Sequence, residues 1–127
     1  MNQNLVDKYQ INFTNKVNYN HVGNFSYITK VPILNNEFLF NFLFDWSASD
    51  LTNVLLPEID QVLNRTISEY ETGSETVSIS IFQTKVDFYD YDLNYVGNIS
   101  TLDFKEICIG WRDFLQTPPL NDTQVES

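Results

Sequence analysis

Residues 75–90, ETVSISIFQTKVDFYD, alternate apolar and polar side chains over most of their length. An alternation with period two is typical of β-strands that have one buried and one solvated face. If the chain turns between Gln83 and Thr84, the segment folds into an antiparallel hairpin over about 76–91. The partners are then Ile79 with Phe88, Ile81 with Val86, Ser78 with Tyr89 and Ser80 with Asp87. No Asn-Gly turn is present, so a single bulged strand across 76–89 remains open.

Two amphipathic helices are predicted on either side of this hairpin. The first spans about 48–71, where Ser47 precedes Asp50 in a capping pattern and apolar residues then recur at helical spacing. Pro57 lies inside it, which predicts either a kink or a second helix with Pro57 in its first turn. The C-terminal helix spans about 101–116, has its own capping pattern and ends before a Pro-Pro pair.

Residues 24–46 are predicted to form another hairpin, which turns at Asn35-Asn36 and places most of its aromatic and β-branched side chains on one face. Pro32 cannot donate a ladder hydrogen bond, so we expect its strand at a sheet edge or a loop wider than two residues. A free edge leaves both a monomer and a weak dimer open. Residues 5–20 are ambiguous, with a short strand near Tyr9 to Phe13 and an Asn-rich loop after it.

These elements predict an α+β fold, in which an antiparallel sheet of two hairpins carries both helices on one face. The 127 residues are enough for a single domain, 1–127, whose core needs neither a metal nor disulfides. Residues 118–127 are polar and are expected to fray.

The net charge of −10 is distributed unevenly along the chain. Residues 1–44 carry three lysines and two acids, whereas residues 45–127 carry fifteen acids and four basic residues, a net of −11. An apolar content of 43% shows that this charge belongs to a folded surface. Such a surface repels nucleic acid and anionic membranes and attracts cationic proteins, although solubility alone would also explain it.

The single cysteine, Cys108, allows no internal disulfide, and the first residues lack the pattern of a signal peptide. No apolar run reaches the length of a membrane span. We therefore expect a cytoplasmic protein.

The inventory of catalytic residues is small. Cys108 lies on the apolar stripe of the C-terminal helix, and His21 lies in a polar loop. The four glycines are too far apart to build a phosphate-binding loop. The aspartates after residue 86 lack the spacing of a calcium loop, so no metal and no cofactor is expected. A hydrolase could use a pair of carboxylates. With seventeen acids in the chain, however, many pairs could be chosen, so the sequence gives little support to a hydrolase.

A protein-binding surface is better supported than catalysis. Tyrosines provide contact area at low entropic cost, and aspartates pair with the arginines of a basic partner. The segment 87–95 alternates the two residue types, and three glutamates follow the long helix. The nominated partner-binding residues are Asp87, Tyr89, Asp90, Tyr91, Asp92, Tyr95, Glu69, Glu71 and Glu75. The alternative is that the tyrosines pack at the sheet margin with their hydroxyls in water.

The run ISTLDFKEICIGWRDFL, residues 99–115, with the strand pair before it, resembles small cytoplasmic immunity proteins of bacterial polymorphic-toxin and contact-dependent growth inhibition systems. The resemblance covers mainly residues 76–115. The matching positions are Thr101, Phe104, Ile107, Trp111, Phe114 and Leu115. It implies a protein that binds a cognate toxin domain, often a nuclease, and blocks its active site or an adjacent surface.

The sequence therefore predicts a non-enzymatic inhibitor that neutralises a basic toxin domain and binds no nucleic acid or membrane. Two alternatives remain: a structural or adaptor domain, which would expose an apolar patch, and a small carboxylate-dependent hydrolase.

Overall fold

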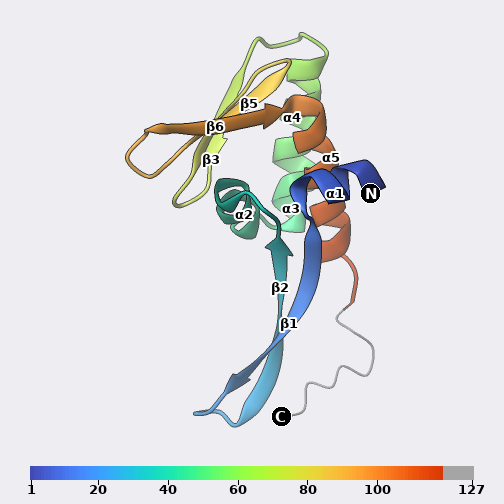
Figure 1. Cartoon of the computed structure of the whole chain (residues 1–127), viewed down its shortest axis with the longest axis vertical. Helices are drawn as coiled ribbons and strands as arrows, with labels where there is room; N and C mark the ends of the chain where they lie inside the picture. The colour runs from blue at the N-terminus through green and yellow to red at the C-terminus, as the bar shows by residue number, and fades with distance from the viewer. Residues whose placement is uncertain (119–127) are drawn as a thin grey trace.

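The computed structural model describes residues 1–118 and has the predicted α+β architecture, built from a two-stranded and a four-stranded antiparallel sheet with helices (Figure 1). The elements in chain order are α1 (Gln3–Tyr9), β1 (Asn12–Asn20), β2 (Phe25–Ile33), α2 (Glu37–Phe44), α3 (Ala48–Asp50), the π-helical turn η1 (Leu51–Leu55), α4 (Leu56–Leu63), β3 (Tyr70–Gly73), β4 (Ser78–Ile81), β5 (Lys85–Tyr89), β6 (Tyr95–Ser100) and α5 (Thr101–Leu115). The predicted frayed tail falls, apart from Pro118, outside the described residues.

The four-stranded sheet contains the predicted hairpin. Its strand order is β3-β4-β5-β6, and β4 pairs with β5 in the predicted register, with Ile79 opposite Phe88 and Ile81 opposite Val86. These four side chains are buried in the main core, where Phe88 packs edge-on against Phe104 of α5. The period-two pattern fixes this register because a slip of one strand by one residue would turn both of its apolar side chains to the polar face.

Helix α5 joins the four-stranded sheet to the rest of the molecule. Ser100 caps it by accepting the backbone N–H of Asp103 at 3.0 Å, as predicted. The buried Trp111 donates its indole N–H to the carbonyl of Leu43 in α2 at 3.1 Å. At the other end, Asp103 accepts hydrogen bonds from the Tyr9 hydroxyl at 2.7 Å and from the Lys8 ammonium at 3.0 Å. Elements that are distant in sequence are thus fixed to one helix.

The prediction of a hairpin over 24–46 is wrong. β2 pairs instead with β1, with Val17 opposite Ile28, and the second half of the segment is the helix α2. The Asn36 side chain caps α2 by accepting the backbone N–H groups of Phe38 and Leu39 at 3.1 Å, so it begins a helix where a turn was predicted. The sheet is therefore not one layer of two hairpins, and most of the Asn-rich segment predicted as loop is β1.

The long helix is shorter than predicted. Continuous helical backbone runs from Ala48 to Leu63, and the chain then turns through Arg65, which has a positive φ of 62°, into strand β3. Pro57 lies in the first turn of α4, one of the two predicted arrangements. The wider π-helical turn η1 precedes it, which suits a residue that donates no backbone hydrogen bond.

Strands β1 and β2 form a ribbon that extends away from the remainder of the molecule (Figure 1). Residues 12–33 contain two lysines and no acid. Several apolar side chains along the ribbon are exposed: Val17, Val22, Phe25, Tyr27 and Ile33. An isolated two-stranded ribbon is marginally stable in water, so its attachment to the core near α2 matters for its order.

Candidate functional site

The four-stranded sheet has a polar face opposite the core. Side chains alternate between the two faces along each strand, so those that are not packed on α5 point to this polar face. The strand register aligns them in rows across the sheet. One row runs Glu71, Ser80, Asp87, Asn98 across the four strands, and the next contains Ser78, Tyr89 and Tyr95. We call these seven residues the outer face. It includes four of the nine nominated partner-binding residues: Glu71, Asp87, Tyr89 and Tyr95.

Asp87 occupies the centre of the outer face on the interior strand β5. Only 7% of the residue is exposed, although Glu71 and Asn98 at the two ends of its row are exposed. Lys85 places its ammonium 3.4 Å from Asp87 Oδ1, which receives no hydrogen bond from residues 1–118. The ion pair with Lys85 offsets part of the cost of enclosing this carboxylate oxygen, although the oxygen accepts no well-aligned hydrogen bond from residues 1–118.

The two nominated tyrosines of the outer face lie against each other. The rings of Tyr89 and Tyr95 meet edge to face with their centroids 6.0 Å apart, and the Asn98 amide donates to the Tyr95 hydroxyl at 2.5 Å. Tyr95 is 53% exposed. The two tyrosines therefore pack at the sheet margin, which was one of the two predicted alternatives. Enough of the Tyr95 ring is still exposed to contact another protein.

The two aspartates of the β5–β6 turn, Asp90 and Asp92, have different environments. The Asp90 carboxylate accepts the backbone N–H groups of Asp92 and Asn94, each at 2.9 Å, and so holds the turn together. Asp92 and Tyr91 extend into solvent, and Tyr91 is 78% exposed. Asp90 is thus a structural residue of the turn, and Asp92 and Tyr91 are its exposed residues.

Leu93 is a further member of this turn that the sequence reasoning missed. It is 70% exposed and adopts a φ of 66°, a left-handed conformation that costs a residue with a Cβ roughly 1 kcal/mol. An exposed apolar side chain held at such a φ is unusual in a solvated turn. Only the backbone geometry reveals this position, because leucine has no preference for turns.

A shallow hollow of about 440 Å³ lies on the outer face beside this turn. The small residues Ser78 and Ser80 line it together with Glu71, Tyr89 and Leu93. A carboxylate, an aromatic ring and two hydroxyls therefore converge on one opening next to the enclosed Asp87.

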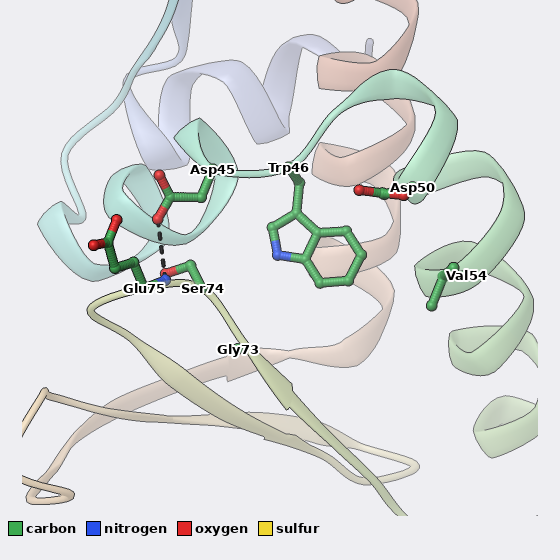
Figure 2. A pocket seen from close by; sticks show the side chains of 7 residues that line it. All are labelled: Asp45, Trp46, Asp50, Val54, Gly73, Ser74 and Glu75. Atoms are coloured by element: carbon green, nitrogen blue, oxygen red, sulfur yellow. Dashed lines mark hydrogen bonds between the residues drawn. The ribbon is translucent and has the colours of Figure 1, made fainter.

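Glu75 lies apart from this hollow, in the β3–β4 turn. It lines a second hollow of about 520 Å³, together with Asp45, Asp50 and the side of the Trp46 indole, as Figure 2 shows. Asp45 Oδ2 accepts the backbone N–H of Glu75 at 3.2 Å and ties the turn to the end of α2. The remaining nominee, Glu69, is exposed in the segment before β3. The structure thus distributes the nine nominated residues over the outer face, the β5–β6 turn and the flank beside β3.

The two residues considered for nucleophilic or acid–base chemistry lie away from the outer face. Cys108 is fully buried in α5, and this burial raises the pKa of its thiol far above the ordinary value. His21 is exposed in the turn of the β1–β2 ribbon, where its ring contacts Tyr19. Among residues 1–118, no three His, Cys, Asp or Glu side chains are grouped so that they could hold a metal ion.

The described part of the chain contains no helix with the length and apolar character needed to cross a membrane. The chain matches no protein-family model, no curated protein and no solved structure.

Proposed function

We propose that this chain is an immunity protein that binds a cognate basic toxin domain in the cytoplasm and blocks its active site or substrate face. The observation that carries the proposal is the outer face, a polar sheet surface on which Glu71 and Tyr95 are exposed, and which continues into the exposed Asp92 and Tyr91 of the β5–β6 turn. The resemblance of residues 76–115 to immunity proteins gives the proposal its specific form.

Electrostatics explain why such a surface suits an inhibitor. A nuclease must attract phosphates, so its substrate face is basic, and an acidic protein is attracted to the same face. The complementary charges speed the encounter, and the exposed tyrosines provide the contact area that stabilises the bound state. A nuclease is therefore the expected class of toxin, and the inhibitor itself performs no chemistry.

Coexpression with the product of the adjacent upstream gene tests the proposal. We expect the two proteins to copurify and the toxicity of the domain to be suppressed. Reversing the charge of Glu71 and Asp92 together to lysine should lower the association rate by about tenfold or more, because both acids are exposed at the proposed interface. Glu106→Lys is the control for charge, since Glu106 is exposed on α5. A neighbour that is neither toxic nor bound would contradict the proposal.

The ribbon favours a second candidate function, that of an adaptor domain in a larger complex. Its exposed Phe25, Tyr27 and Ile33 lie on one face of β2 and form the kind of apolar surface expected of such a domain, and residues 12–33 carry a positive charge in an acidic protein. In this case a partner would cover the ribbon and leave the outer face in solvent.

A further inference from the structure

The hollow on the outer face has the composition of a site for a planar cation. We propose that it binds the guanidinium group of an arginine side chain from the partner protein, with Glu71 as the ion-pairing carboxylate and Tyr89 as the stacking ring. The inference deepens the proposed function and rests on it for the identity of the partner, but the site can be tested without the toxin.

The arrangement of side chains in the hollow distinguishes arginine from other ligands. Neighbouring strands are about 4.8 Å apart, so Glu71 on β3 and Asp87 on β5 lie about 10 Å apart with Ser80 between them. A guanidinium above Ser80 can donate to a carboxylate and to serine hydroxyls in several directions at once. The adjacent Tyr89 ring offers a face for stacking, which a planar guanidinium uses better than a compact ammonium.

Asp87 supplies an independent reason to expect a cation here. It is 93% buried, beside Ser80 in the same row, and its Oδ1 accepts no hydrogen bond within residues 1–118. Its cationic neighbour, Lys85, approaches to 3.4 Å and keeps a half-exposed side chain that water can solvate. Asp87 therefore offsets the repulsion that the Lys85 ammonium would exert on a cation above Ser80, and Glu71 provides the direct ion pair.

The experiment uses the purified full chain and N-acetyl-L-arginine amide as the probe. Its binding is followed by ¹⁵N–¹H correlation spectra, with N-acetyl-L-citrulline amide as the uncharged control of nearly the same shape. We expect saturable shifts at the amides of Ser78, Ser80 and Tyr89 with the arginine probe and none with the citrulline probe. Equal shifts with both probes, or shifts spread evenly over all exposed acids, would overturn the inference.

Two variants locate the site. Glu71→Gln and Asp87→Asn should each weaken binding of the probe by about tenfold, because the first removes the ion-pairing carboxylate and the second leaves the charge of Lys85 uncompensated beside the hollow. Glu71 is exposed, so its variant stays folded even if the central Asp87→Asn loses stability. Glu106→Gln should bind the probe like the wild type. Unchanged affinity in Glu71→Gln would overturn the inference.

The inference and the proposed function can fail separately. If the wild type binds the arginine probe in the hollow but the product of the adjacent upstream gene is neither toxic nor bound, the proposed function is wrong and the arginine site stands. If the toxin domain binds but Glu71→Gln and Asp87→Asn bind the probe like the wild type, the arginine site is wrong and the proposed function stands.

Discussion

Replacement of Asp90 by alanine tests whether this residue serves the fold rather than the partner. Its Oδ1 accepts two backbone N–H groups at 2.9 Å, and its Oδ2 lies 3.4 Å from the amide nitrogen of Asn94. Hydrogen bonds to a charged group contribute about 1.5–3 kcal/mol each, and the exposure of this turn places them at or below the lower end. With about 1 kcal/mol for each of the two short bonds, Asp90→Ala should destabilise the protein by about 2 kcal/mol.

Urea and thermal unfolding followed by tryptophan fluorescence measure this loss. A destabilisation of 2 kcal/mol corresponds to a fall in Tm of roughly 8 °C for a chain of this size. Asp90→Asn keeps an acceptor oxygen for the backbone and should lose about half as much. Asp92→Ala is the matched control, because the Asp92 side chain is exposed in the same turn, and its stability should change by less than about 0.5 kcal/mol. Equal stabilities of the Asp90→Ala and Asp92→Ala variants would refute the reasoning.

Three further predictions follow from other parts of the structure. Leu93→Gly should raise the free energy of unfolding by up to about 1 kcal/mol, because glycine adopts the positive φ without strain. A loss of stability in urea unfolding would contradict this expectation. The same variant should weaken partner binding, because it removes an exposed apolar side chain. Burial opposes ionisation of Asp103, but hydrogen bonds from Tyr9 and Lys8 outweigh it and lower the pKa of this carboxyl. The resulting stabilisation is present above the ordinary aspartate pKa of about 4 and is lost as the pH falls through the lowered pKa. Tyr9→Phe removes one of these hydrogen bonds, so its free energy of unfolding should fall less than that of the wild type between pH 6 and pH 2. The Cys108 thiol should react with a disulfide reagent only at the rate of unfolding, and rapid labelling of the native protein would show that α5 is not packed as described.

The sequence predicted the elements in which several signals agree. The β4–β5 register followed from apolar side chains that can be buried in one pairing only, and α5 followed from a serine cap, an apolar stripe and a following proline pair. Residues 37–44 gave no such agreement, because EFLFNFLF is apolar at almost every position and fits either a strand or a helix. Asn36 is also ambiguous, since asparagine is favoured both in turns and at helix N-caps. The tertiary context selected the helix.

The candidate site was predicted in part for the same reason. The polar face of the hairpin, with Asp87 and Tyr89, follows from the period-two pattern. The turn-forming role of Asp90 and the exposure of Leu93 depend on backbone geometry that the sequence does not encode locally. The neighbourhood of Trp46 and Glu75 joins segments about thirty residues apart, and that contact depends on the position of α2. Most of strand β1, beyond the short strand predicted near Tyr9 to Phe13, was missed because its polar asparagines have no fully buried face to alternate with.

The central claim is that the outer face and the β5–β6 turn contact the toxin domain. Amide hydrogen exchange of this chain, free and in complex with a toxin domain that copurifies with it, tests it most directly. The account predicts that protection on binding is concentrated in residues 71–80 and 87–98, with little change in the ribbon of residues 12–33. Protection confined to the ribbon or to the exposed side of α5, with residues 71–80 and 87–98 unchanged, would contradict it.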